Sequence, residues 1–223
     1  MIICEVGLNH LGDEKYAEEY VDTAIQSKVD ALTFYIGDNS FYQQPKFSNF
    51  KLSDEFYLKT TKKLKENKIK FGVMISDISK IDFFEKIKTD FYKVFSNDIN
   101  NHELILKLIA TNKKIFVSTG MSDLEEIKKL VNFIQNSKEQ FTLIHTQLSN
   151  NLDIVNLKAI SMLQKKFAMP IAFGNHASNT NVLYVSLGYE PSDLLFYIKG
   201  NKKDHPDDPH AIKLVNLSEV IKN

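Results

Sequence analysis

Residues 1–36, MIICEVGLNHLGDEKYAEEYVDTAIQSKVDALTFYI, decide the fold because they contain one complete strand–helix–strand unit. Residues 2–8 and 31–36 are short runs dominated by apolar side chains. Between them, residues 13–27 repeat apolar side chains every three or four positions among charged ones, which is the pattern of a surface helix. Two such strands joined by a helix predict parallel neighbours in a sheet that is buried on both faces.

The same unit recurs along the chain. Further strands are predicted at 70–75, 91–95, 114–118, 141–145, 170–173 and 193–198, and further helices at 54–67, 102–111 and 123–136. Ser53, Asn101 and Ser122 precede three of these helices and are expected to cap them. Eight units in strict strand-then-helix order favour an α/β fold of the closed (β/α)8 TIM barrel type, and 223 residues suffice for one such domain over 1–223.

Composition excludes several classes of function. The 28 Lys and Arg residues balance 28 Asp and Glu residues, so no basic surface for nucleic acid or for an anionic membrane is expected. No apolar run approaches the roughly 20 residues that span a bilayer. The single cysteine, Cys4, cannot form an intrachain disulfide, and no cleavable leader precedes the first strand, so we expect a cytoplasmic protein. Nucleotide-binding glycine motifs are absent.

Polar side chains follow several of the predicted strands. In a TIM barrel the strand carboxyl ends and the loops after them form the active face, so these side chains should converge on one rim. The candidates are Glu5, Lys93, Ser96, Asp98, Ser118, His145 and His176.

Each candidate also has a purely structural interpretation. Glu5 lies in an apolar strand, where a carboxylate is either functional or paired with a lysine. Lys93 is suited to a phosphate, a carboxylate or a Schiff base, or else reaches solvent. Ser118 begins a turn that either binds an anion or only connects a strand to a helix. His145 and His176, at the ends of neighbouring strands, are more often packing residues than ligands.

Two loops also have both a functional and a structural interpretation. Residues 205–210, HPDDPH, look like a metal motif, but acidic, proline-rich turns are common on surfaces and a structural role is favoured. The long loop 37–52 follows the second strand. The aromatic residues in or near this loop, Tyr35, Phe41 and Tyr42, either form the floor of a sugar-binding site or pack on one another.

These strand ends resemble the sialic acid synthase family. The most specific stretch is residues 2–13, IICEVGLNHLGD, which is similar to the family's opening strand and turn. The second is 113–127, KKIFVSTGMSDLEEI, which is similar to its fifth strand and helix. The resemblance implies a catalytic barrel that condenses phosphoenolpyruvate with an N-acetylated amino sugar, and it implies a homodimer.

The resemblance also implies roles for particular residues. Glu5 matches an active-site glutamate, Lys93 and Ser96 match residues that hold the phosphate, and His176 matches one of two histidines that bind a divalent metal, Mn²⁺ or Mg²⁺. Other family positions are substituted here, at Thr33, Met74, Leu148, Asn150, Gly174, Asn175 and Ile198. Ile198 is the position assigned to the second metal histidine, so weakened metal binding is expected, with Asp204, Asp207 or Asp208 as a substitute ligand. The family's C-terminal antifreeze-like domain, with its arginine, is expected to be missing.

Three hypotheses follow from this mixed pattern. The first is an enzyme, a phosphoenolpyruvate-dependent transferase of nonulosonic acid biosynthesis that forms a C–C bond, with Glu5, Lys93 and Ser96 facing one cavity. The second is a pseudoenzyme, a sugar-binding or regulatory barrel whose rim is filled by Met74, Leu148 and Ile198. The third is a lyase that uses Lys93 or Lys199 as a Schiff-base amine.

Overall fold

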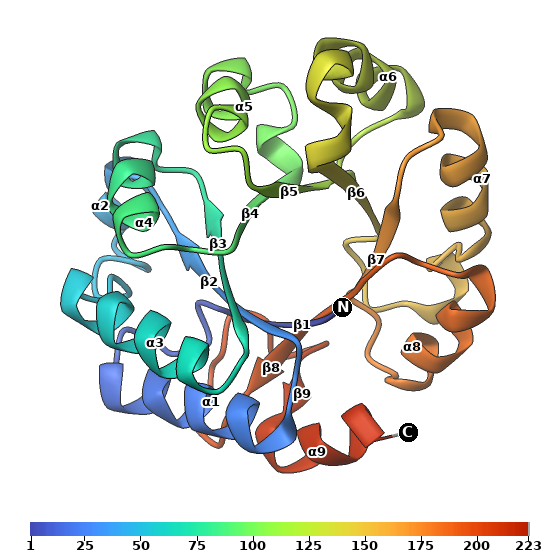
Figure 1. The fold of residues 1–223 in the computed structure, drawn as a ribbon. Coiled ribbons are helices and arrows are strands. Elements are labelled where there is room, and N and C mark those ends of the chain that lie inside the picture. The colour runs from blue at the N-terminus through green and yellow to red at the C-terminus, as the bar shows by residue number, and fades with distance from the viewer. Residues whose placement is uncertain (223) are drawn as a thin grey trace.

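The computed structural model describes residues 1–222 and forms a closed barrel of parallel strands (Figure 1). Strands β1 to β8 pair in sequence order, and β8 pairs with β1 to complete the ring. The predicted (β/α)8 barrel is therefore confirmed. The strands are β1 (Ile2–Gly7), β2 (Ala31–Ile36), β3 (Lys70–Ile75), β4 (Phe91–Val94), β5 (Lys114–Ser118), β6 (Phe141–Thr146), β7 (Ile171–Asn175), β8 (Leu194–Lys199) and β9 (Ile212–Lys213).

Helices surround the strands on the outside of the ring (Figure 1). They are α1 (Glu14–Ser27), α2 (Asn39–Gln43), α3 (Asp54–Glu66), α4 (Ile81–Lys86), α5 (His102–Ile109), α6 (Leu124–Phe133), α7 (Lys158–Phe167), α8 (Asn181–Ser186) and α9 (Leu214–Lys222). Two details differ from the prediction. The long loop 37–52 contains the short helix α2, and Asp123, not Ser122, caps α6, because Glu126 completes a capping box with it.

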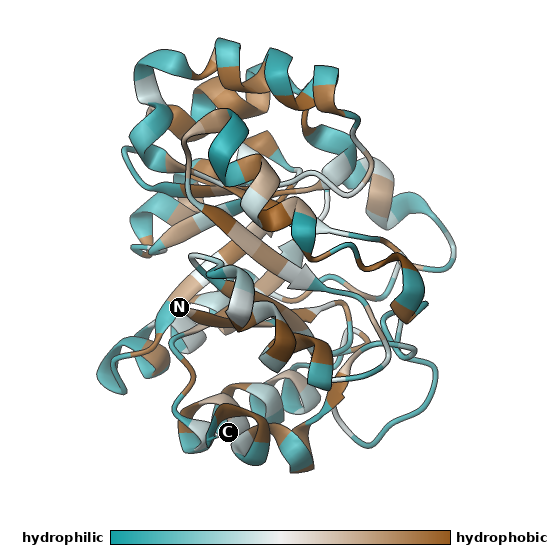
Figure 2. Ribbon diagram, turned by 90° about the vertical axis from the view of Figure 1, so that its right-hand side faces the viewer, coloured by the Kyte–Doolittle hydropathy of each residue, from teal (hydrophilic) through white to brown (hydrophobic). Residues whose placement is uncertain are grey.

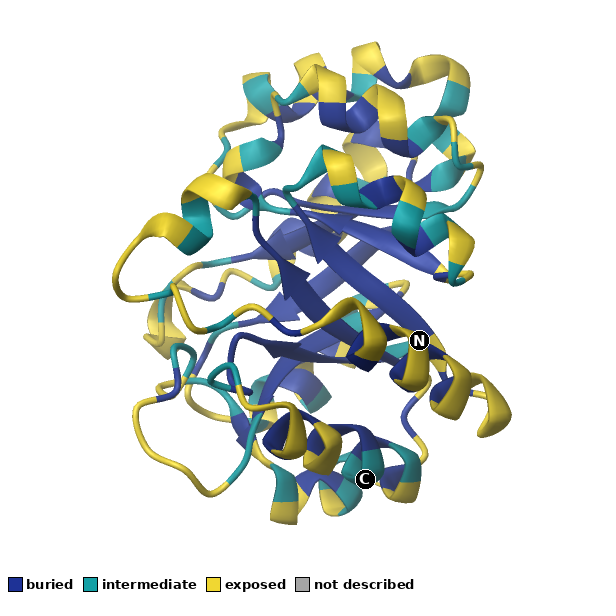
Figure 3. Ribbon diagram, turned by 90° about the vertical axis from the view of Figure 1, so that its left-hand side faces the viewer, coloured by how far each residue is buried: buried dark blue, intermediate teal, exposed yellow. Residues whose placement is uncertain are grey.

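The barrel wall is buried on both faces, as parallel strands require (Figure 3). The helices expose polar outer faces and turn apolar residues towards the strands (Figure 2). None of the helices in residues 1–222 combines the length and apolarity that crossing a bilayer would demand.

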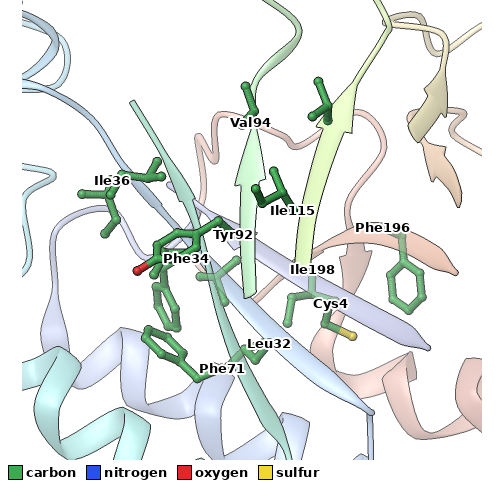
Figure 4. Packing of buried hydrophobic residues seen from close by; sticks show 14 of the residues in the cluster. Cys4, Leu32, Phe34, Ile36, Phe71, Tyr92, Val94, Ile115, Phe196 and Ile198 are labelled. Atoms are coloured by element: carbon green, nitrogen blue, oxygen red, sulfur yellow. The ribbon is translucent and has the colours of Figure 1, made fainter. Parts of the chain in front are cut away.

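Strand residues alternate between two environments, which decides which side chains reach the rim. Cys4, Phe34, Phe196 and Ile198 belong to the large cluster between strands and helices (Figure 4). The strand residues that alternate with those of the large cluster point into the barrel. Among them, a separate inner cluster is formed by Ile3, Ala31, Phe91, Phe116, Ile144, Ala172 and Leu195. Above this inner cluster, at the carboxyl ends of the strands, lie the polar residues of the candidate site.

Candidate active site

Two adjoining cavities lie at the carboxyl ends of the strands and share Phe95, Asn97 and Tyr197. The first, of about 330 Å³, is called the basic cavity and is also lined by Lys93, Ser96, Ser118, Met121, Leu148 and His176. The second, of about 260 Å³, is called the aromatic cavity and is also lined by Gly7, Leu8, Tyr35, Phe41, Met74, Pro206 and Asp207. A further cavity, of about 240 Å³, is lined by residues such as Met1, Leu194 and Val220 and includes none of the predicted site residues.

Glu5 and Lys93 meet inside the barrel, although 88 positions separate them in the chain. The ammonium of Lys93 donates to the carboxylate of Glu5, and both side chains are almost completely buried. The Lys93 ammonium also lies 5.8 Å from the centre of the Tyr197 ring. Lys93 lines the basic cavity, whereas Glu5 is excluded from its lining and is linked to it through Lys93. Both interpretations of Glu5 thus have support, because it is paired with a lysine and that lysine faces the cavity.

Ser96 and Ser118 lie beside Lys93 on the wall of the basic cavity. Ser96 follows β4, and Ser118 is the last residue of β5. Their hydroxyl oxygens are 2.7 Å apart. Both are buried, so the rim offers one cation and two hydroxyl groups within a small volume. Such a set suits a phosphate or carboxylate, since charge-assisted hydrogen bonds to an anion are strong where water is scarce.

Asp98 is held at the edge of the site. Its carboxylate accepts a hydrogen bond of 2.9 Å from the Ser76 hydroxyl, which links the chain after β3 to the chain after β4. Asp98 is not among the residues that line either cavity. The structure therefore gives this predicted substrate-binding residue a supporting position.

His145 faces away from the rim, contrary to the prediction that it binds substrate. Its Nε2 lies 3.1 Å from the carbonyl oxygen of Val155, and its ring stacks on Phe173 of the outer cluster. Burial lowers the pKa of His145. Since successive strand residues point to opposite faces, Ile144 and Thr146 point inward, and Thr146 is the one at the carboxyl end of β6.

Ile198 also belongs to the outer layer and is fully buried beside Cys4 (Figure 4). It therefore neither fills the rim nor marks the β8 position from which a ligand would be lost. Tyr197, one residue earlier, has the inward phase and lines both cavities. Burial raises the pKa of Tyr197 well above its usual value, and the carboxylates of Glu5 and Asp207 add to the effect, so its hydroxyl stays protonated.

His176 and His210 are neighbours across the site. Their ring centres are 4.5 Å apart, and Tyr197 lies within 5.6 Å of His176 and 5.2 Å of His210. The Thr146 hydroxyl is 2.8 Å from Nδ1 of His176. Burial lowers the pKa of His176 to about 3 and that of His210 to about 4, so both imidazoles are neutral at pH 7.

The residues of the motif 205–210 do not share one role, because some hold the loop in place and one enters a cavity. The Nε2 atom of His205 is 2.8 Å from the Tyr16 hydroxyl, so His205 holds the loop against α1. Asp207 enters the aromatic cavity, where burial and the neighbouring Glu5 raise its pKa to about 7. Space for this carboxylate exists because residue 7 is glycine, whose missing Cβ would lie 3.1 Å from Asp207 Oδ2. His205 therefore has a structural role, and so does Asp208, whose carboxylate pairs with Lys199.

Apolar side chains occupy the rim beside β1, β2 and β3. Met74 is buried against Leu8 and Tyr35, and Phe41, Phe47 and Phe50 of the long loop pack onto this group. The rings of Phe41 and Phe47 stack with centres 4.5 Å apart. The loop aromatics therefore pack on one another, and Tyr35 and Phe41 also line the aromatic cavity.

The sequence missed Tyr197 and Thr146 as rim residues, and it named Asp207 and His210 only within a loop motif for which a structural role was favoured. Strand alternation, applied from Lys93 around the barrel, would have identified Tyr197 and Thr146. No comparable signal exists for Asp207 and His210, because a loop has no fixed periodicity. The Schiff-base hypothesis finds no free amine, since Lys93 is paired with Glu5 and Lys199 with Asp208.

The fold and rim define a (β/α)8 barrel with one ammonium and two hydroxyl groups gathered in a cavity at the strand carboxyl ends. The sequence pattern of the NeuB family matches residues 15–192, so the chain belongs to that family. It is 30% identical over 239 residues to an uncharacterized protein of Methanocaldococcus jannaschii, covering 100% of this chain and 69% of that protein. It is 27% identical over 212 residues to the N,N'-diacetyllegionaminic acid synthase of Campylobacter jejuni, covering 84% of this chain and 63% of the synthase.

Solved structures agree on the fold. The N-acetylneuraminic acid (sialic acid) synthetase of Leptospira borgpetersenii superposes with a TM-score of 0.89 at 22% identity, over 99% of this chain and 81% of that chain. The spore coat polysaccharide biosynthesis protein SpsE of Bacillus subtilis superposes with a TM-score of 0.88 at 20% identity, over 100% of this chain and 66% of that chain. The resemblance to sialic acid synthases is confirmed.

Proposed function

We propose that the chain is a nonulosonic acid synthase-like enzyme that joins phosphoenolpyruvate to an N-acetylated amino sugar. The observation that carries this proposal is the cluster of Lys93, Ser96 and Ser118 on one wall of the basic cavity. One cation and two hydroxyl groups suit the phosphate of phosphoenolpyruvate. The adjoining aromatic cavity offers room for the sugar. Membership of the NeuB family and the named synthase relatives support the same reaction class.

The reaction forms one C–C bond and releases phosphate. The methylene carbon of phosphoenolpyruvate attacks the sugar aldehyde, water adds to the carbon that carries the phosphate, and inorganic phosphate leaves. Lys93, Ser96 and Ser118 would hold the phosphate throughout. Tyr197 borders both cavities and stays protonated, and its hydroxyl would donate a hydrogen bond to the aldehyde oxygen. A bound divalent metal would polarise that same oxygen.

A binding-only barrel is the second candidate, and Met74 favours it. The sequence resemblance places a threonine of the phosphate site at this position, and the methionine is buried against Leu8 and Tyr35 instead. The carboxylate of Glu5 also pairs with the Lys93 ammonium, which reduces the positive charge offered to an anion. Such a protein would bind phosphoenolpyruvate or a sugar acid but release no phosphate.

Ligand-dependent thermal unfolding tests the proposed site. Millimolar phosphoenolpyruvate, with Mn²⁺ and N-acetylmannosamine present, should raise the Tm of the wild type. The double variant Ser96→Ala/Ser118→Ala should bind at least tenfold more weakly, since each lost charge-assisted contact is worth about 1.5–3 kcal/mol. Ser48→Ala/Ser161→Ala, which changes two exposed serines, is the matched control and should keep the full shift. A wild type whose Tm no ligand moves would remove support for both candidates.

We further propose a homodimer, by analogy with the family. Sedimentation equilibrium of the purified chain checks this directly. A single species of 25.6 kDa at micromolar concentration would contradict it.

A further inference from the structure

We propose that His210, from the loop between β8 and β9, replaces the missing strand-borne histidine and joins His176 in a two-imidazole site for a divalent transition metal. The inference deepens the proposed function, because it names the residues that would hold the metal at that site. It also stands apart from catalysis, since metal binding can be measured without any substrate.

The spacing of the two rings fits one shared ion. Two imidazoles that each bind through nitrogen at about 2.1 Å place their ring centres on the order of 5 Å apart. The centres of His176 and His210 are 4.5 Å apart. The two rings are therefore close enough to share one ion.

Each imidazole has a nitrogen to offer. Nδ1 of His176 is engaged by the Thr146 hydroxyl, which leaves Nε2 as the ligating atom, and such an outer hydrogen bond is typical of metal-bound histidine. Nε2 of His210 is buried and has no hydrogen-bond partner within residues 1–222. A buried nitrogen without a partner costs free energy unless water or an ion satisfies it.

The loop is built to hold His210 in this place. His205 contacts Tyr16, the backbone N–H of Asp207 donates to the Asn9 side chain, and Lys202 pairs with Asp13. Within the loop, the N–H of His210 donates to the carbonyl of Asp207, so one turn carries both side chains to the rim. Tyr197 occupies the inward β8 position, and the imidazole beside His176 comes from the loop.

The metal would complete its coordination with water or substrate oxygens. Among residues 1–222, no group of three or more His, Cys, Asp or Glu side chains is placed to hold an ion. Two nitrogens with oxygen ligands suit Mn²⁺, Co²⁺ or Zn²⁺ better than Mg²⁺, which prefers oxygen alone. Asp207 Oδ1 is 3.8 Å from His210 Nε2, near enough to accept a hydrogen bond from a metal-bound water.

Two measurements on the full chain test the site. Mn²⁺ titration followed by electron paramagnetic resonance gives the affinity, and long-range ¹H–¹⁵N spectra with Zn²⁺ show which imidazoles are ligated. We expect one ion per chain, with the ring signals of both His176 and His210 moving at one equivalent. His210→Gln and His176→Gln should each weaken Mn²⁺ binding at least tenfold. His102→Gln, at an exposed position of α5, is the control and should bind like the wild type.

Unchanged Mn²⁺ affinity in His210→Gln, or a His210 ring signal that Zn²⁺ leaves in place, would overturn the inference. The ring signals are read on the wild type, so this outcome does not depend on a variant that folds. Substrate is absent from both measurements. A failure here would therefore leave the phosphoenolpyruvate site of Lys93, Ser96 and Ser118 to be judged by its own test.

Discussion

Glu5 and Lys93 place opposite charges inside a barrel whose interior is otherwise mostly apolar. Removing one partner of a buried pair leaves the other charge without compensation, which costs about 3–5 kcal/mol. Lys93→Met should therefore lower the free energy of unfolding by this amount in urea at pH 7. The double variant Glu5→Gln/Lys93→Met should lose less than half as much. Equal losses in both proteins would show that the ion pair is not what stabilises this layer.

The lowered pKa of buried His10 should make the stability of the fold depend on pH. Burial lowers its pKa to about 3, whereas the unfolded chain has the usual value of 6.5. Below pH 6.5 the unfolded state takes up a proton that the folded state refuses, so stability falls as the pH decreases towards 3. Between pH 7 and pH 5 this single group should remove about 2 kcal/mol.

Urea unfolding of the wild type and of His10→Asn checks this pH dependence. Nδ1 of His10 accepts a hydrogen bond from the N–H of Gly12, and the asparagine oxygen is expected to replace that acceptor. The variant should lose about 2 kcal/mol less than the wild type between the two pH values. An identical loss in both proteins would show that His10 does not cause the acid sensitivity.

The turn after β1 depends on glycine at position 12. Gly12 has φ +76°, and a Cβ at this position would lie 1.7 Å from the carbonyl oxygen of Asn49 in the long loop. Gly12→Ala must therefore move the loop and strain the turn, at a cost of about 3 kcal/mol or more. Gly188→Ala is the control, because nothing lies within 4 Å of its added carbon and its φ is not positive.

Thermal unfolding compares the two alanine variants. Gly12→Ala should melt well below the wild type, whereas Gly188→Ala should match it or gain up to about 1 kcal/mol from a less flexible unfolded chain. Equal melting temperatures of the two variants would contradict the close contact between the turn and the long loop.

Strand positions were predictable from the sequence, but the facing of single residues was only partly so. Lys93, Ser96 and Ser118 meet as expected, because parallel strands bring their carboxyl ends to one rim. His145 and Ile198 are expected at the rim from the resemblance, but the alternation of side chains along β6 and β8 turns both towards the outer face of the barrel. Asp207 and His210 needed the structure, since long-range contacts to Asn9 and Tyr16 determine where their loop lies.

The whole barrel follows from eight repeats of one local pattern, and that is why the fold was predictable. The eight barrel strands are mostly apolar, the longer helices each bury one apolar face, and the pairing of β8 with β1 leaves no open edge in the ring. The activity does not follow in the same way, because the rim combines a phosphate-type cluster with Met74 and an internally neutralised Lys93. The cluster favours a barrel that catalyses a reaction, whereas Met74 and the paired Lys93 favour a barrel that only binds a ligand.

Phosphate release from phosphoenolpyruvate, followed by ³¹P NMR with the purified chain, Mn²⁺ and N-acetylmannosamine or a diacetylated amino sugar, tests the proposed synthase most directly. A synthase should give an inorganic phosphate signal that requires an amino sugar, grows with enzyme concentration and is lost in Ser96→Ala/Ser118→Ala. Phosphoenolpyruvate that remains intact with every amino sugar, although it raises the Tm of the same preparation, would contradict the synthase and leave the binding-only barrel.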